Sequence, residues 1–252
     1  MKAPTAQLAI DILKPLVAEL GPAQAAFWVT PTMVLTLSGA RGIADGVFYT
    51  NDVTLQAKWQ QELRAALKIF DKTRPEPMIV VGSHTNPMGR VYVSYDVLFV
   101  PGLEYALHQT KLLSDADKIK LLHGPIDNES LGVMTKLLKH HPDTKEFDEE
   151  FLGHVATGIL LGYPDQAIVG ALKARLQGAS FVPFAHIKYA DFYHCPQPIY
   201  ERPDDLKNNV SIKKHEQDWS KLLKDFYTSD FHKDLAKDPA FMEKAKQIGL
   251  TT

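Results

Sequence analysis

His154 lies in a segment whose small residues would leave room beside its side chain. Gly153 and Gly158 flank it, although a glycine inside a helix costs about 1 kcal/mol relative to alanine. Their presence indicates close approach, either by another backbone or by a ligand resting against the histidine. The acids at 148–150 would raise its proton affinity if they are near, which suits a general base working around neutral pH. The other interpretation is a buried histidine hydrogen-bonded to a carbonyl.

Reactive side chains also gather between residues 186 and 195. This stretch contains the only cysteine, Cys195, and the carboxylate of Asp191. On a single strand, alternation would place these two on one face and the two histidines of the segment on the other. Cys195 would then need a histidine from elsewhere, such as His154, to act as a nucleophile. As a small buried apolar side chain it would need none.

The glycine-rich stretch at 38–46 carries Arg41. We expect it to follow a strand and precede a helix, a context in which backbone N–H groups can hold a phosphate. The spacing of Gly39, Gly42 and Gly46 matches neither the dinucleotide fingerprint nor the Lys-Ser/Thr phosphate loop. The alternative is a loop that requires special backbone angles, and we expect Gly39 or Gly42 to adopt a positive φ.

Three further polar residues stand where a side chain could meet a substrate. Asp96 lies in the middle of an apolar strand pattern, where a carboxylate must be exposed, paired or shifted in pKa. Both an ion pair and catalysis remain open for it. His84 borders a predicted turn, and Tyr163 lies between two predicted helices. The candidate catalytic residues are therefore His154, Asp96 and Cys195, and the candidate substrate-binding residues are Arg41, His84, Tyr163 and Asp191.

The remaining histidines do not have metal-ligand spacing. His140 and His141 are neighbours on a predicted helix and would point about 100° apart. His186 and His194 would lie about 26 Å apart on an extended strand, too far to share an ion. We expect no metal site, and the sequence indicates no particular cofactor.

The elements that position these residues follow from the spacing of apolar side chains. That spacing predicts helices over residues 8–20, 55–70, 114–123, 127–141, 148–162, 164–176, 212–226 and 239–248. It predicts strands over residues 32–38, 78–81, 91–100 and 181–194. Residues 86–89 read Asn-Pro-Met-Gly, the chemistry of a type I turn, and should join two of these strands as an antiparallel hairpin.

These elements predict an α+β fold: a small mixed or antiparallel sheet with a central β-hairpin, covered by many helices. Residues 1–203 would form the α+β core domain, and residues 204–252 a helical C-terminal extension. The extension is too short for a core of its own, so we expect it to pack on the rest as one domain. The expected central core contains Leu63, Leu67, Val80, Val93, Val97, Leu138, Val155 and Ile168.

The composition of the chain limits which classes of partner and which cellular compartment we expect for it. The chain has 252 residues, with 28 Lys and Arg against 30 Asp and Glu, so a net charge of −2 favours neither nucleic acid nor membrane as a partner. One cysteine excludes a disulfide scaffold and fits a reducing compartment. No stretch has the roughly 18 consecutive apolar residues of a membrane span, and charges interrupt the N-terminal apolar stretch. We expect a soluble, cytoplasmic protein.

Two classes of function remain open. The first is a soluble enzyme, a hydrolase or transferase with a histidine general base acting on a small or anionic substrate. The second is a non-catalytic protein-interaction or binding domain. Convergence of His154, Asp96, Arg41 and segment 189–195 on one pocket would favour the enzyme, and their dispersal would favour the binding domain. The sequence indicates neither a substrate nor an oligomeric state.

Overall fold

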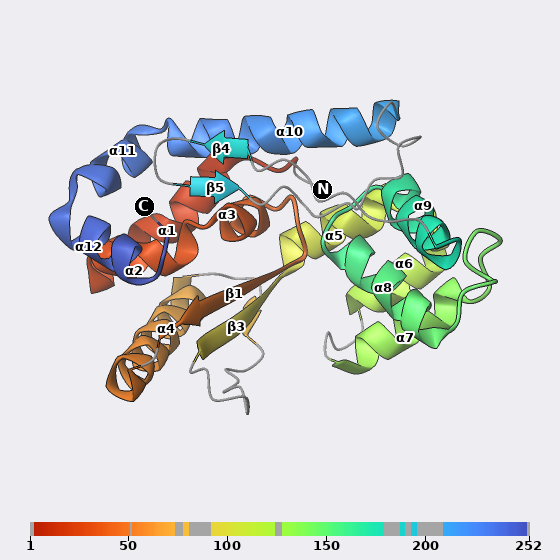
Figure 1. Cartoon of the computed structure of the whole chain (residues 1–252), viewed down its shortest axis with the longest axis horizontal. Coiled ribbons are helices and arrows are strands. Elements are labelled where there is room, and N and C mark those ends of the chain that lie inside the picture. The colour runs from red at the N-terminus through yellow and green to blue at the C-terminus, as the bar shows by residue number, and fades with distance from the viewer. Residues whose placement is uncertain are drawn as a thin grey trace.

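Helices make up most of the computed structural model, and they gather in two groups spanned by the long helix α10 (Val210–Tyr227) (Figure 1). The structure describes residues 3–50, 52–73, 78–80, 92–123, 128–178, 187–189, 193–195 and 209–250. Within this part of the chain, no helix combines the length and the apolar character needed to cross a membrane.

The N-terminal helices begin where polar side chains cap them. In α1 (Ala6–Leu20), the hydroxyl of Thr5 accepts a hydrogen bond from the backbone N–H of Leu8. Pro15 lies inside α1, and the helix continues to Leu20. After it come α2 (Pro22–Ala25), the short turn η1 (Ala26–Trp28) and α3 (Pro31–Leu37).

The strand predicted over residues 32–38 is wrong, because this segment forms α3. Thr30 accepts a hydrogen bond from the Met33 N–H at 3.3 Å, and Pro31 occupies the first turn, which are two signals of a helix start. The helix is buried on nearly all sides, so it lacks the polar face that reveals helical periodicity. The glycine-rich stretch consequently follows a helix and leads into strand β1 (Ile43–Tyr49), the reverse of the expected order.

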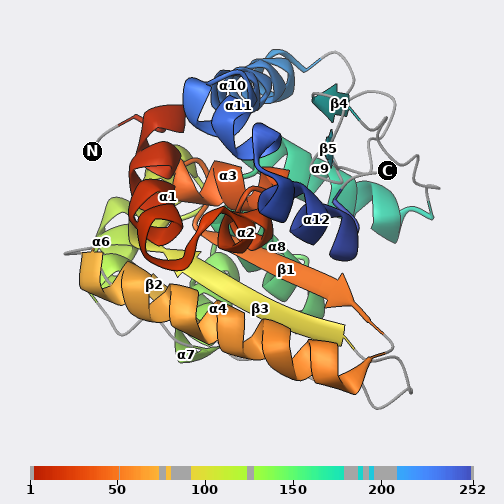
Figure 2. The ribbon, with the colours of Figure 1, turned by 90° about the vertical axis from the view of Figure 1, so that its left-hand side faces the viewer.

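The sheet has the strand order β1-β3-β2, with both pairings antiparallel. Strand β3 (Tyr92–Phe99) lies between β1 and β2 (Met78–Val80), as its continuous apolar pattern predicted. Residues 86–89, and with them the predicted hairpin turn, lie outside the described residues. Helix α4 (Val53–Thr73) runs alongside the strands (Figure 2) and begins at Asp52, whose carboxylate accepts from the N–H groups of the first turn.

The second group of helices follows β3 directly. It contains α5 (Val100–Gln109), α6 (Asp115–His123), α7 (Asn128–Leu138), α8 (Glu149–Leu160) and α9 (Asp165–Leu176). Side chains cap the N-termini of two of these helices. Ser114 accepts from the Asp117 N–H before α6, and Asp148 accepts from the Phe151 N–H before α8.

A single strand over residues 181–194 is also wrong. Strands β4 (Ile187–Tyr189) and β5 (Tyr193–Cys195) pair antiparallel with each other in a separate sheet, with Lys188 opposite His194. The chain therefore reverses direction between them. Strands of this length are too short for an alternating pattern to identify, and Asp191, of a residue type common in turns, stands between them in the sequence.

The C-terminal helices pack on the N-terminal ones. Helices α11 (Asp230–Lys237) and α12 (Pro239–Gln247) follow α10, and the hydroxyl of Tyr227 donates to the Val29 carbonyl at 2.9 Å. The division of the chain at residues 203 and 204 stays a prediction, since this connection lies outside the described residues.

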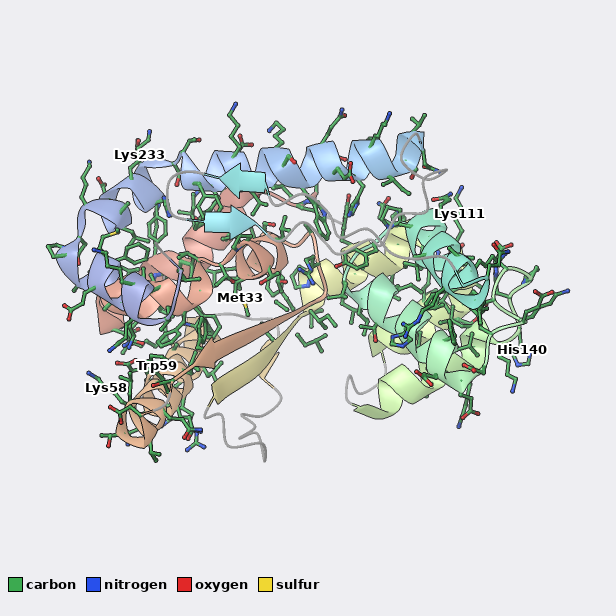
Figure 3. The ribbon with its side chains drawn as sticks, viewed as in Figure 1. Met33, Lys58, Trp59, Lys111, His140 and Lys233 are labelled. Atoms are coloured by element: carbon green, nitrogen blue, oxygen red, sulfur yellow. The ribbon has the colours of Figure 1, made fainter. Side chains whose placement is uncertain are left out.

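Among the described residues, two large hydrophobic clusters and one small one, Ala167 with Ile212, replace the single core that the sequence suggested. The first cluster joins α1–α4, β1, β3 and α10–α12, and the second joins α5–α9. Figure 3 shows Met33 and Trp59 in the first cluster and His140 at the outer edge of the second group. Of the expected core residues, Leu63 and Val97 are buried in the first cluster, Leu67 is half-buried beside it, and Leu138, Val155 and Ile168 are buried in the second. The side chains of Val80 and Val93 lie outside the described part.

Candidate functional site

Arg41 lies where the two hydrophobic clusters meet. The residue that follows it, Gly42, donates its N–H to the Leu160 carbonyl at 2.8 Å, at the end of α8. The Gly42 carbonyl accepts from the Phe99 N–H at 2.7 Å, at the end of β3. These two hydrogen bonds fix the backbone beside Arg41 to both groups of elements.

Two glycines on neighbouring elements allow this close approach. A Cβ at Gly102 would stand 1.8 Å from the Arg41 carbonyl oxygen, and one at Gly162 would stand 2.6 Å from the Ala40 carbonyl oxygen. No side chain fits at either distance. Gly162 also has a φ of +77°, and Gly39, just before Arg41, has a φ of +84°. The expectation of a positive φ at Gly39 or Gly42 is thus confirmed at Gly39.

The guanidinium of Arg41 is buried and has no carboxylate partner among the described residues. The residue is 4% exposed, and its Nε has no hydrogen-bond acceptor. Its Cζ lies 5.7 Å from the ring of Trp219, a cation–π contact worth about 2 kcal/mol when desolvated. Among the side chains that the structure describes, no carboxylate forms an ion pair with Arg41. Burial of a charge is costly unless an opposite charge and hydrogen bonds compensate it, so this guanidinium lacks its usual compensation.

Trp219 of α10 connects Arg41 to other polar side chains. The ring of Tyr163 lies 5.8 Å from that of Trp219, and the ring of His215 lies 4.4 Å from it. Tyr163 also packs against both hydrophobic clusters. Arg41 and Tyr163, two of the expected substrate-binding residues, therefore contact one side chain.

A cleft opens beside these rings, between α5, the α8–α9 connection and α10. It has a volume of about 290 Å³, near the lower end of the range for small-molecule sites. We call it the Trp219 cleft, after the buried ring that its lining residues Tyr163 and His215 contact. The cleft is lined by Tyr105, Ala106, Gln109, Lys111, Gly162, Tyr163, Pro164, Asp165, Gln166, Ser211, Lys214, His215 and Asp218.

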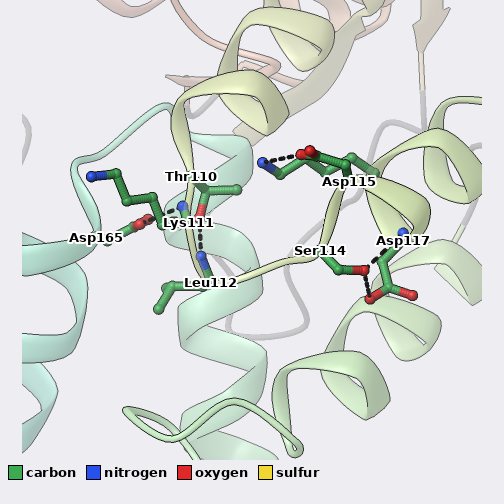
Figure 4. Close-up of polar contacts among 8 residues, drawn as sticks. Thr110, Lys111, Leu112, Ser114, Asp115, Asp117 and Asp165 are labelled. Atoms are coloured by element: carbon green, nitrogen blue, oxygen red, sulfur yellow. Dashed lines mark hydrogen bonds and ion pairs between the residues drawn. The ribbon is translucent and has the colours of Figure 1, made fainter.

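Asp165 fixes one wall of the Trp219 cleft. Its carboxylate oxygens accept hydrogen bonds from the Thr110 hydroxyl and from the Lys111 N–H, both at 2.6 Å (Figure 4). The carboxylate also stands in the first turn of α9, where the helix dipole favours negative charge. Asp165 thus ties the N-terminus of α9 to the segment after α5, and its charge is already engaged.

The protonation states of two lining residues are set by burial. Burial, and secondarily the charge of Arg41, lowers the pKa of His215 to about 4, so this imidazole is neutral at pH 7. Burial, and secondarily the charge of Asp218, raises the pKa of Tyr105, so its phenol keeps its proton. The cleft therefore offers a neutral imidazole and a neutral phenol between charged side chains.

His154 lies outside the Trp219 cleft. Its side chain is 51% exposed, and its Nε2 lies 4.0 Å from the carboxylate of Glu150. Close packing accounts for Gly158 of α8, because a Cβ there would stand 2.9 Å from Ile168 of α9, whereas a Cβ at Gly153 would have no neighbour within 4 Å. A buried histidine is therefore the wrong interpretation, and the catalytic role of His154 stays a prediction.

For two of the other expected site residues the structure describes only the backbone, and for the remaining two it describes nothing. Asp96 in β3 stands opposite Asp45 in β1, and Cys195 ends β5 opposite Ile187. Their side chains, and the residues His84 and Asp191 entirely, lie outside the described part. Convergence of the candidate catalytic residues on one pocket thus remains a prediction.

Sequence reasoning missed the residues that α10 contributes to the cleft. The alternating charges of this helix predict a solvated face, and Lys214 and Asp218 are indeed exposed, but together with the half-buried His215 they also line the cleft. His215 precedes the apolar Trp219 at i,i+4 spacing, which places the two on the same face of a helix and was the available signal. Within the described part, no three metal-binding side chains come together.

No protein-family model matches the chain, and no curated protein or solved structure matches it significantly.

Proposed function

We propose that the chain binds a small anionic ligand at the Trp219 cleft, with Arg41, which contacts Trp219 but is not itself a lining residue of the cleft, as the counter-charge. The observation that supports this proposal is the 4% exposed guanidinium with no carboxylate partner among the described side chains. Arginine stays protonated at any physiological pH, so it cannot relieve its burial by losing a proton. A carboxylate or phosphate would supply both the opposite charge and the missing hydrogen-bond acceptor.

The surrounding residues favour the same class of ligand. Lys111 and Lys214 line the cleft and would attract an anion toward it. His215, neutral at pH 7, retains one N–H that can donate to a ligand oxygen. The volume of about 290 Å³ suits a metabolite rather than a polymer.

A catalytic role on the same ligand is the second proposal, and it retains the hydrolase or transferase class. Its support is that His215 lines the cleft and that the charge of Arg41 contributes to its low pKa. A bound anion would offset the charge of Arg41, the lesser cause of this low pKa, and so raise the pKa of His215 and make it a better proton acceptor. His215 would then accept a proton from the attacking water or hydroxyl group.

Isothermal titration calorimetry with inorganic phosphate, sulfate and short carboxylates tests the binding proposal. We expect saturable binding by the native chain and a loss of at least about tenfold in affinity in Arg41→Gln, equivalent to about 1.4 kcal/mol. Arg41→Lys should retain part of the affinity, since it keeps the charge but not the planar donor geometry. Circular dichroism checks that each variant is folded.

The matched control is Arg64→Gln, which removes an exposed arginine of α4. It should leave the affinity unchanged. Absence of binding by the native chain, or equal affinity in Arg41→Gln, would contradict the proposal.

A further inference from the structure

Helix α10 contains two Lys-Asp pairs with the same i,i+4 spacing and the same order. Lys221 and Asp225 close an ion pair at 2.7 Å on the outer surface. Lys214 and Asp218 form no ion pair with each other, although the structure describes both side chains. The difference between the two pairs is that Lys214 and Asp218 both line the Trp219 cleft. Their charges face the cleft instead of neutralising each other.

The environment of Asp218 makes its charge available to a ligand. Nothing in the described part of the chain donates a hydrogen bond to Asp218, whereas Asp165 across the cleft has two donors. Burial raises the pKa of the Tyr105 phenol in α5, and the negative charge of Asp218 raises it further. The cleft thus presents a solvent-exposed carboxylate, without a donor among the described residues, together with an aromatic ring, two groups that can bind an ammonium.

Two positively charged side chains lie near this stretch of α10: Arg41, from the segment before β1, and Lys214, on α10 itself. Arg41 contacts Trp219, the residue that follows Asp218. Lys214 is one turn earlier on α10 and also lines the cleft. Lys214 and Asp218, which carry opposite charges, therefore both line the cleft without forming an ion pair with each other, and Arg41 lies outside this lining, in contact with Trp219.

We propose that the ligand of the Trp219 cleft is a small zwitterion of the amino-acid class. Its ammonium group binds between Asp218 and Tyr105, and its carboxylate binds toward Arg41 and Lys214. This inference rests on the proposed anion site and adds a second, cationic subsite to it. A ligand bearing only one of the two charges leaves the other subsite unpaired, so it binds more weakly.

Calorimetry with chemically matched ligands tests the cationic subsite. The probes are the standard amino acids and a series of ω-amino acids, together with their N-acetyl forms, which keep only the carboxylate, and their amides, which keep only the ammonium. We expect at least one free amino acid to bind the native chain at least about tenfold more tightly than its N-acetyl form and its amide.

Two variants locate the subsite. Asp218→Asn should reduce the preference for the free amino acid over its N-acetyl form to less than about twofold, while binding of the N-acetyl form persists. Asp225→Asn, which removes the paired aspartate on the outer surface, should leave the preference unchanged. Arg41→Gln should weaken both ligands.

The possible failures are distinguishable. Equal binding of every free amino acid and its N-acetyl form by the native chain would overturn the zwitterion and leave the anion site standing. A preference that survives Asp218→Asn would overturn the assignment of Asp218. Failure of all carboxylates, phosphate and sulfate to bind would overturn the proposed function itself.

Discussion

The guanidinium of Arg41 lies 5.7 Å from the indole ring of Trp219, which joins the segment after α3 to helix α10. These residues are 178 positions apart in the sequence. Trp219 also contacts Tyr163 and His215. One buried ring thus contacts the guanidinium of Arg41 and two lining residues of the Trp219 cleft, Tyr163 and His215.

Trp219→Leu should affect both stability and ligand binding. Removing most of a 4% exposed indole leaves a cavity, and we expect a loss of about 3 kcal/mol in the free energy of unfolding. Ligand affinity should fall as well, because Arg41, Tyr163 and His215 lose their shared support. Urea unfolding and calorimetry measure the two effects.

Trp59→Leu is the control for that variant. Trp59 is fully buried in the first cluster, and its ring contacts Phe27 and Phe48 rather than lining residues of the Trp219 cleft. It should lower stability by a similar amount and leave the affinity of the folded protein unchanged. Equal affinities in both variants would contradict the role given to Trp219.

Acid should destabilise the fold through two buried histidines. Burial lowers the pKa of His215 to about 4, with Arg41 as the lesser cause, and burial lowers that of His232 to about 4 against an opposing hydrogen bond with the Tyr227 backbone. The unfolded chain binds protons near pH 6.5 and the folded chain near pH 4. The stabilisation is therefore complete above pH 6.5 and is lost as the pH falls from there toward 4.

The expected loss between pH 7 and pH 5 is about 2 kcal/mol for each histidine. Urea unfolding at the two pH values measures it, and His232→Gln should remove one histidine's share of the difference. A free energy of unfolding that stays constant over this range would show that these histidines are not buried in the neutral form.

Glu62 of α4 and Lys244 of α12 form an ion pair that anchors the last helix. The side chain of Lys244 is 7% exposed, and its ammonium also lies 4.9 Å from the ring of Phe27. Burial lowers the pKa of Lys244, and the hydrogen bond and charge of Glu62 oppose this shift. Glu62→Gln leaves a buried ammonium without its counter-charge, so we expect a loss of about 3 kcal/mol in unfolding free energy.

The double variant Glu62→Leu, Lys244→Met removes both charges and should cost less than Glu62→Gln alone. Chemical denaturation compares the two proteins. A double variant less stable than the single one would mean that the ion pair itself, rather than the unpaired ammonium, determines the loss.

Two glycines should respond in opposite directions to alanine. A Cβ at Gly102 would stand 1.8 Å from the Arg41 carbonyl, so Gly102→Ala should displace the backbone beside Arg41 and cost at least about 2 kcal/mol. Gly153 lies inside α8 with no atom within 4 Å of an added Cβ, so Gly153→Ala should stabilise the fold by about 0.5–1 kcal/mol. Thermal unfolding of the two variants checks both signs, and a destabilised Gly153→Ala would contradict the open space described at that position.

Local signals predicted most helices but not their assembly. Polar side chains such as Asp52, Ser114 and Asp148 stand next to the helix they begin, and all three accept hydrogen bonds from N–H groups of its first turn. Helix α3 was mistaken for a strand because its burial on nearly all sides removed the polar face that shows a helical period. Short β4 and β5 gave too few residues for an alternating pattern to reveal a reversal.

The Trp219 cleft was beyond local reasoning for a different reason. Its lining comes from three segments, 105–111, 162–166 and 211–218, that are far apart in the sequence. The sequence predicted Arg41 and Tyr163 separately as substrate-binding residues, the first because of its glycine-rich surroundings and the second because of its position between two helices. Only tertiary packing through Trp219 brings them together, and no spacing along the chain encodes that contact.

The most direct test of the central claim is the Nε–H resonance of Arg41 in a ¹H–¹⁵N spectrum, assigned by its absence from the spectrum of Arg41→Lys. Because the guanidinium is buried and its Nε lacks an acceptor, a bound anion should change this resonance strongly. Titration with phosphate or a carboxylate should shift the resonance saturably, while that of the exposed Arg64 stays in place. An Arg41 resonance that remains unchanged up to high anion concentration would contradict the anion site.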